Sequence, residues 1–369
     1  MLGLRWNGAW QRATRTVIAA SVLALAAAGL VAFLAMLGGH DPIRALDALW
    51  RGSLGSQYAI FSGTLVRATP LILTGLAVAV AFTAGVMNIG AEGQLLVGGA
   101  AATATGLTLG ENLGWLVIPC ALGCGALAGA AWAGVPGWLR RRYGVLEVIS
   151  TIMMNFVALY LIGYLVRGPL QEPLRIYPQS PPIPDAAMLP LLGGTRLHVG
   201  FPLALLCALG AWWALRATAA GFRVRVVGFS PAAAHSAGLV DVRATTFRAF
   251  LVSGGLAGLA GAVEVMGVTY SLYENLSPGY GYTAIAVALV GALNPLLTAM
   301  SGIFFGALEA GAAAMQRDAG VPSVLATIVE ASLILLVLAA SVSRLGFLRR
   351  RAAGPVPPPA LHLDTGDRR

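Results

Sequence analysis

The 369-residue sequence contains no lysine, and all 24 of its basic residues are arginines. A phosphate-binding loop of the Gly-x-x-x-x-Gly-Lys-Ser/Thr type requires a lysine, so we predict no ATPase site of this kind in the chain. Charge of either sign is scarce: 11% of residues are charged, whereas 57% are hydrophobic and the mean hydropathy is +0.78. These values exclude an ordinary soluble domain and predict a polytopic membrane protein.

Cysteine and histidine are also few. The three cysteines, Cys120, Cys124 and Cys207, lie within apolar runs, where they are interpreted as small packing residues rather than as a disulfide framework or a metal cluster. The four histidines are dispersed through loops and the tail, and the sequence has no His-Glu-x-x-His or Gly-x-Ser-x-Gly motif. We therefore predict no catalytic residues, no metal and no cofactor in this chain, and no enzymatic activity of its own.

Ten runs of mostly apolar residues are long enough to predict transmembrane helices. The first is interpreted as a retained helix rather than a secretory signal, because no Ala-x-Ala site follows it cleanly. The predicted fold class is all-α, a polytopic membrane protein with about ten transmembrane helices. The runs lie near residues 17–37, 60–82, 93–110, 115–136, 145–166, 199–215, 245–267, 279–293, 297–316 and 323–343.

The arginines predict the orientation. With the amino terminus inside, 17 arginines fall in cytoplasmic segments and 6 in external ones, and Arg67 lies within the second run. By the positive-inside rule both termini are expected in the cytoplasm, and the net charge of +9 requires no nucleic-acid partner. Arg67 is expected either to pair with an acid or to extend to the outer interface.

The chain is expected to have three parts. Residues 1–59 hold the N-terminal cytoplasmic segment, the first helix and an external loop; residues 60–343 form the main transmembrane domain; and residues 344–369 form a basic cytoplasmic tail. Two long loops interrupt the main domain. The external loop, 167–198, is rich in proline, and it either presents a semi-rigid surface to a partner or forms a passive lid.

The cytoplasmic loop, 216–244, is predicted to carry a short helix in its second half. Ser230 is a suitable N-cap, Pro231 suits the first helical position, and Gly238 can adopt the left-handed conformation that ends a helix. So short a helix is marginal alone in water, so it docks either on another protein or on its own bundle. The residues assigned to this docking segment are Arg223, Arg225, Gly228, Ser230, Pro231, Ala232, Ala233 and Gly238.

Two polar, glycine-containing breaks, at 85–94 and 272–282, separate apolar segments in corresponding places of the two halves. Such breaks are tolerated at membrane depth only where they line a cavity or are buried in protein, and paired breaks indicate a transport site between structural repeats. The second break is expected to lie opposite the first, near mid-membrane. The residues predicted to line a substrate path are Asn88, Gly90, Glu92, Gln94, Asn155, Tyr280 and Tyr282.

Other polar residues in the apolar runs allow two interpretations. Glu264, Glu309 and Glu330, like Asn155, either contact a solute or form interhelical hydrogen bonds that fix packing. Neutral amides with a few carboxylates suit hydrogen bonding to a polyhydroxylated or heterocyclic solute.

At these motifs the sequence resembles permeases of the ATP-binding-cassette (ABC) importers, in the simple-sugar and nucleoside branch of the family that also includes branched-chain amino acid permeases. The string Asn88-Ile89-Gly90-Ala91-Glu92-Gly93-Gln94 is most like the nucleoside-type members. The resemblance covers roughly residues 60 to 343, and its other carriers are the segments 68–76, 147–155 and 284–295.

The resemblance implies a type II-like ABC importer permease with two weakly similar halves, in a bacterial inner membrane. It also implies a second permease chain, a cytoplasmic ABC ATPase that binds ATP and Mg²⁺, and an extracytoplasmic substrate-binding protein or lipoprotein. The segment 221–238 would then be the loop whose helix seats in the ATPase. Two details depart from the family pattern: Phe229-Ser230-Pro231 stands where members usually show Glu-Asn-Pro, and Glu330-Ala331 stands where a Gln-Gly pair is common.

The expected function is therefore that of the transmembrane subunit of an importer that takes up nucleosides by alternating access. A simple sugar is the alternative substrate. A proton-coupled secondary transporter using Glu92, Glu264 or Glu309 is a rival of another class, and a membrane scaffold without transport is a third, disfavoured by the two breaks.

Overall fold

The structure is a computed structural model, and it describes residues 25–236, 238, 240–322, 324–325, 327–329 and 331–332. Within these residues the chain is almost entirely helical, with two isolated β-bridges and no strand, which confirms the all-α prediction. The helices are α2 (Pro42–Ser53), α3 (Leu65–Thr83), α4 (Ala91–Leu113), α5 (Val117–Tyr143), α6 (Glu147–Arg167), α7 (Gly200–Ala217), α8 (Ala219–Phe229), α9 (Pro231–Ser236), α10 (Val242–Glu264), α11 (Tyr280–Val290) and α12 (Pro295–Ala319). Shorter helical segments are η1 (Ala59–Thr64), η2 (Gly114–Leu116), η3 (Asp185–Ala187) and η4 (Val265–Thr269).

Six continuous helical segments of the described chain are long and apolar enough to cross a membrane, so the protein is a multi-pass membrane protein. Each agrees with one of the runs found in the sequence. They are Ala59–Thr83, Gly114–Tyr143, Glu147–Arg167, Gly200–Ala217, Val242–Thr269 and Pro295–Ala319.

Of the remaining four runs, one is a helix as predicted, one is shorter than predicted, and two are described only in part. The run 93–110 forms α4, which has 23 residues but a composition rich in glycine and threonine that lowers its hydropathy. The run 279–293 is shorter than expected, because α11 has 11 residues and then turns at Gly291. Of the first run the structure describes an apolar helix, Leu25–Leu37, and most of the last run, 323–343, including Glu330, lies outside the described residues, as does the tail.

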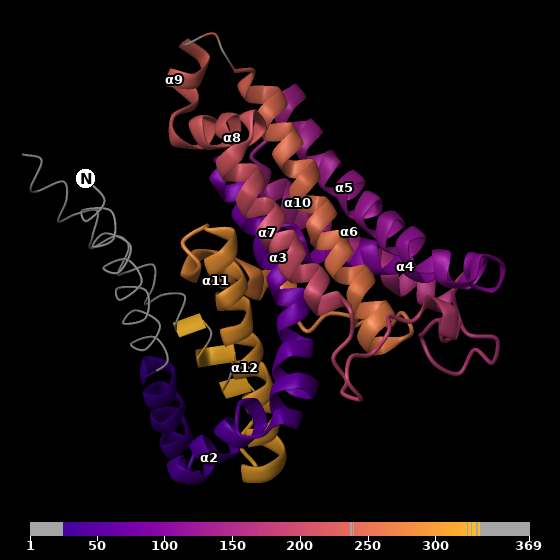
Figure 1. The fold of residues 1–369 in the computed structure, drawn as a ribbon, viewed down its shortest axis with the longest axis vertical. Coiled ribbons are helices and arrows are strands. Elements are labelled where there is room, and N and C mark those ends of the chain that lie inside the picture. The colour runs from indigo at the N-terminus through magenta and orange to yellow at the C-terminus, as the bar shows by residue number, and fades with distance from the viewer. Residues whose placement is uncertain are drawn as a thin grey trace, which may run out of the picture.

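The long helices run between two ends of the bundle (Figure 1). One end carries α8 and α9 beside the last turn of α5, and we call it the α8–α9 end. The opposite end carries α2 and the irregular segment 168–199, and we call it the loop end. α3, α5 and α7 run toward the α8–α9 end, whereas α4, α6, α10 and α12 run toward the loop end.

Glycines allow α4, α5 and α10 to approach backbone to backbone. A methyl group on Gly129 of α5 would lie 2.6 Å from the Cα atom of Gly258 in α10 and 2.8 Å from its nitrogen. Gly98 of α4 packs against the same residue, Gly258. A methyl group on Gly125 of α5 would lie 3.0 Å from the carbonyl oxygen of Gly98. Packing through small residues is the usual way in which membrane helices associate, because lipid tails supply no hydrophobic drive.

The segment 168–199 at the loop end is hydrogen-bonded to the second break rather than lying apart from it. The amide of Ser180 donates to the carbonyl of Leu272 at 2.9 Å, and the amide of Leu272 donates to Ser180 Oγ at 2.9 Å. The amide of Ile183 donates to the carbonyl of Tyr270 at 2.8 Å. His198 is fully buried, and burial lowers its pKa to about 4, so its imidazole is neutral at pH 7. The segment therefore covers the second break, and a contact with a partner protein stays a prediction.

We expect Gly129→Ala to lower the free energy of unfolding by about 1–3 kcal/mol, because the new methyl overlaps backbone atoms of α10. Gly123→Ala is the matched control on the same helix, since nothing lies within 4 Å of its added methyl. Thermal unfolding in detergent measures both. Equal unfolding temperatures for the two variants would show that the close approach of α5 and α10 is wrong.

Candidate functional site

The first break folds back into the bundle from the α8–α9 end. α3 ends at Thr83, Gly85 has a φ of +71°, and α4 begins only at Ala91. The left-handed conformation at Gly85 favours glycine and reverses the chain there. Asn88 lies in the irregular segment between the helices and is fully buried.

Asn88 and Gln94 are joined by two amide–amide hydrogen bonds. Asn88 Nδ2 donates to Gln94 Oε1 at 2.9 Å, and Gln94 Nε2 donates to Asn88 Oδ1 at 3.0 Å. Asn88 Nδ2 also donates to Ser253 Oγ at 2.8 Å, while its Oδ1 accepts from the amide of Gly90 at 3.0 Å. Ser253, halfway along α10, in turn donates to the carbonyl of Ala77 in α3 at 2.7 Å. These buried polar groups are thus satisfied by protein and tie three helices together.

Asn155 of α6 supports the same break from the other side. Its Oδ1 accepts from the amide of Gly93 at 2.9 Å, and its Nδ2 donates to the carbonyl of Ile89 at 3.0 Å. The Nδ2 atom also lies 3.4 Å from the hydroxyl oxygen of Tyr282, to which it donates. Asn155 therefore makes the kind of interhelical hydrogen bond that we considered, and its contact with a solute stays a prediction.

The second break enters the bundle from the loop end and meets the first. α10 and η4 end at Thr269, Gly279 has a φ of +106°, and α11 begins at Tyr280. The amide of Gly281 donates to Glu92 Oε2 at 2.7 Å. Since Glu92 is in the first turn of α4 and Gly281 in the first turn of α11, the carboxylate lies at two helix N-termini, where the partial positive charge stabilises an anion.

All seven residues predicted to line the path lie at this meeting point of the two breaks. Tyr280 is buried, with 6% of its surface exposed, and directly precedes Gly281, whereas Tyr282 is 46% exposed. Tyr282 reaches Asn155, and Glu92 reaches the amide of Gly281, so the breaks face each other as expected. Their role in binding a solute stays a prediction.

Sequence reasoning left Arg67 out of the site. In the structure Arg67 of α3 and Glu264 of α10 are close enough to interact electrostatically, although they come from different helices. Glu264 is 4% exposed, and its Oε2 atom has no hydrogen-bond partner among the described residues. The signal that was available is the cost of an isolated charge within a span, which predicts that an intramembrane arginine lies near intramembrane acids.

The predicted short helix is present as α9. Ser230 caps it, since Ser230 Oγ accepts from the amide of Ala233 at 3.2 Å, and Pro231 is its first residue. Gly238 has a φ of +66°, as expected for a residue that ends a helix. Ala232 is exposed, as is Ala233.

The first half of this loop, however, forms a second helix, α8, that we did not predict. Thr218 caps it by accepting from the amide of Gly221 at 3.0 Å, a Thr-x-x-Gly signal that the sequence did contain. Arg223 and Arg225 lie exposed on α8, and Phe229 at its end is 95% exposed.

Gly228 near the end of α8 rests on the first break. A methyl group on Gly228 would overlap the carbonyl oxygen of Thr83 and lie 3.1 Å from the amide nitrogen of Gly85. Only glycine allows α8 to approach the end of α3 this closely. The docking segment is therefore in direct contact with the first break at Gly85, three residues before Asn88, the first residue predicted for the path.

The chain matches the family profile described as branched-chain amino acid transport system / permease component over residues 60–338. The chain belongs to this permease family. The permease is 37% identical to the guanosine ABC transporter permease protein NupP of Bacillus subtilis (strain 168), across 90% of this chain and 96% of NupP. It is 36% identical to the glucose ABC transporter permease protein TsgB13 of Haloferax volcanii, across 86% of this chain and 85% of TsgB13. It is 29% identical to the nucleoside ABC transporter permease protein NupB of Lactococcus lactis subsp. cremoris, across 84% of this chain and 86% of NupB. No solved structure matches it significantly.

We expect Glu92→Ala to lower the free energy of unfolding of the permease by about 1–3 kcal/mol, because it leaves the buried amide of Gly281 without an acceptor. Glu92→Gln keeps an acceptor oxygen in the same place and should stay close to the parent. Thermal unfolding in detergent at pH 7 compares the three proteins. If the Ala variant were as stable as the Gln variant, the hydrogen bond between Glu92 and the amide of Gly281 would not contribute to stability.

Proposed function

We propose that the permease is the transmembrane subunit of an ABC importer that takes up nucleosides by alternating access. The relatives support this, since NupP is named a guanosine permease and NupB a nucleoside permease. The observation that carries the proposal is the contact of Glu92 with the amide of Gly281. It joins two breaks that enter the bundle from opposite ends, so a solute bound between them is reached from either side when one break moves.

The charges at the meeting point favour a neutral solute. The Glu92 carboxylate already occupies the positive ends of α4 and α11, and Arg67 of α3 interacts electrostatically with Glu264 of α10. A phosphate would have to displace or face these carboxylates. The amides of Asn88, Gln94 and Asn155, by contrast, match the donors and acceptors of a nucleobase and a ribose.

In this mechanism the side-chain amides of Asn88 and Gln94 bond each other when no solute is bound, and a solute breaks these bonds when it enters. Asn88 and Gln94 bond each other, so a nucleoside gains their hydrogen bonds only by replacing existing ones. The ring of Tyr282, which is half exposed beside Asn155, offers a face for stacking on a base. A base stacked on such a ring is typically worth about 1–3 kcal/mol, by analogy with nucleic-acid binders.

A glucose-type substrate is the second candidate, because TsgB13, a glucose permease, is 36% identical to this chain. Amides and carboxylates also bind sugar hydroxyls. The tyrosines at the second break favour the nucleoside, because a sugar alone has no aromatic base to stack.

The energy is proposed to come from a cytoplasmic ABC ATPase that binds ATP and Mg²⁺, while this chain itself catalyses no reaction. A second permease chain and an extracytoplasmic substrate-binding protein or lipoprotein complete the complex. We place the α8–α9 end and both termini in the cytoplasm of a cell with this complex in its inner membrane, because arginines concentrate at that end. The 95% exposed Phe229, between α8 and α9, supports docking there, because buried aromatic anchors are typical of protein interfaces.

We propose that Gly228 transmits a movement of the ATPase to the residues of the substrate path. α8 rests on Thr83 and Gly85, so a displacement of α8 and α9 moves the start of the first break directly. Asn88 lies three residues beyond Gly85 and donates hydrogen bonds to Gln94 and Ser253. The same displacement therefore weakens these hydrogen bonds.

Vesicles holding the reconstituted complex test the substrate. We expect ATP-dependent uptake of labelled uridine and adenosine that is unaffected by a protonophore, and no competition from uridine monophosphate. Robust ribose or galactose uptake without competition from any nucleoside would replace the nucleoside by a sugar. Uptake that persisted without ATP and collapsed with the proton gradient would overturn the importer itself.

We expect Gly228→Ala to reduce nucleoside uptake at least about tenfold, a loss of about 1.4 kcal/mol in transition-state free energy, because its methyl forces α8 away from Thr83. The ATPase should still co-purify, since the surface of α9 is unchanged. Gly210→Ala in α7, where nothing lies within 4 Å, is the control and should transport as the parent does. Parental uptake by the Gly228 variant would rule out this route of coupling.

A further inference from the structure

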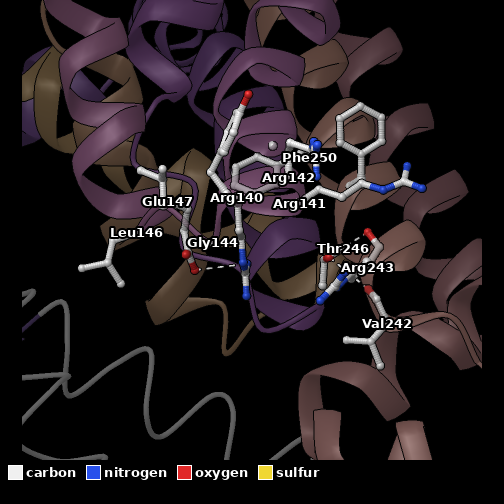
Figure 2. Close-up of a pocket in the computed structure, with 14 residues that line it drawn as sticks. Arg140, Arg141, Arg142, Gly144, Leu146, Glu147, Val242, Arg243, Thr246 and Phe250 are labelled. Carbon is white, nitrogen blue, oxygen red and sulfur yellow. Dashed lines mark hydrogen bonds and ion pairs between the residues drawn. The ribbon is translucent and has the colours of Figure 1, made fainter.

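A cavity of about 560 Å³ opens at the α8–α9 end, and Glu147 in its wall accepts a hydrogen bond from the amide of Met87 in the first break (Figure 2). The last turn of α5 supplies Arg140, Arg141 and Arg142 to its wall, and the first turn of α10 supplies Arg243. A second cavity of about 540 Å³ shares three of these arginines and adds Trp138 and Asp241.

Three of the four guanidinium groups form no ion pair within 4.0 Å in the part of the chain that the structure describes, although Arg141 and Arg243 act electrostatically on Asp241. Arg140 forms an ion pair with Glu147, with 3.1 Å between Arg140 Nη1 and Glu147 Oε1, although the angles do not make a hydrogen bond. Arg141, Arg142 and Arg243 have no ion pair or hydrogen bond through their side chains among the described residues. Arg141 instead lies over the ring of Phe247 at 5.8 Å, which leaves its N–H groups directed elsewhere.

The cavities are positively charged overall. The four arginines face two acids, Glu147 and Asp241. A hydrogen bond from the amide of Ala244, aided by the nearby arginines, lowers the pKa of Asp241. An excess of two positive charges remains, which suits a phosphate that accepts several charge-assisted hydrogen bonds.

The surroundings identify this level as a membrane interface. Trp138 and Tyr143, 51% and 64% exposed, make an edge-to-face contact with 5.5 Å between ring centroids, and exposed aromatic side chains mark the headgroup region. Leu146 and Ile149, at the start of α6, are 66% and 57% exposed beside the cavity, where an acyl chain would lie.

We propose that these cavities bind the phosphate headgroup of an anionic phospholipid of the cytoplasmic leaflet, with Arg141, Arg142 and Arg243 as its ligands. Basic pockets between helices on the cytoplasmic side are suited to such headgroups. The site lies beside Asp241, the N-cap of α10 that follows α9, so a bound lipid also steadies the base of the docking segment.

The test uses the purified complex in a neutral detergent, titrated with short-chain phosphatidylglycerol and monitored by native mass spectrometry. We expect one saturable lipid per permease chain, no binding of phosphatidylcholine at the same concentration, and no displacement by inorganic phosphate. In the double variant Arg141→Gln/Arg243→Gln the apparent Kd should rise about tenfold or more.

Arg216→Gln is the matched control, because Arg216 also lies exposed at a helix C-terminus of the same end and stacks on Trp212 at 5.2 Å, yet does not line the cavities. It should bind the lipid as the parent does. If the double variant unfolds at a lower temperature without lipid, the exposed single variant Arg142→Gln carries the test, with the same direction of change.

Three outcomes would overturn the proposal. Displacement of the lipid by inorganic phosphate would make the cavities a site for free anions. Loss of ATPase co-purification in the double variant with unchanged lipid binding would assign the arginines to the ATPase surface. If the double variant and the Arg216 variant bound the lipid equally, the binding would be explained by the overall positive charge of this end and not by a specific site.

Discussion

The structure around the two breaks is determined by the need for hydrogen-bond partners for backbone amides and carbonyls that water cannot reach. A helix interrupted within a membrane leaves amides and carbonyls that lipid cannot hydrogen-bond. Here the interruption before α4 is satisfied by the side chains of Asn88 and Asn155, and the start of α11 by the carboxylate of Glu92. The two breaks are thus stabilised by their own side chains and by Asn155 of α6, and these hydrogen bonds tie α4, α6 and α11 together.

Much of the fold was predictable because membrane helices can be recognised in a sequence by their length and apolar composition. The six segments that meet both criteria were all found from the sequence. α11 was placed correctly but made too long, since Gly291 to Asn294 continue the apolar run in sequence while the chain turns. α8 was missed for the opposite reason: its arginines and glycines look like a loop, and its helix is fixed by the cap at Thr218 and by packing on α3.

The candidate site was predictable in its members and not in its connections. Polar residues within apolar runs are conspicuous, so Asn88, Glu92 and Gln94 could be named from the sequence. That Gln94 would pair with Asn88 depends on the path of the irregular segment before α4. That Ser253 would bond both Asn88 and Ala77 depends on the rotation of α10, which its weak amphipathicity does not specify. The position of Arg67 near Glu264 likewise depends on tertiary packing.

The backbone-to-backbone contacts of α4, α5 and α10 bear on which parts move. Where Gly98, Gly125, Gly129 and Gly258 meet, there are no side-chain tips to slide past one another, so any shift meets hard backbone atoms. We therefore expect these three helices to move as one rigid body. α3 differs, because it touches α8 through Gly228 and meets α10 through the hydroxyl of Ser253, a contact that breaks and re-forms readily. We therefore expect α3 to shift against α10 more easily than α5 can, because no glycine pair locks the backbones of α3 and α10 together.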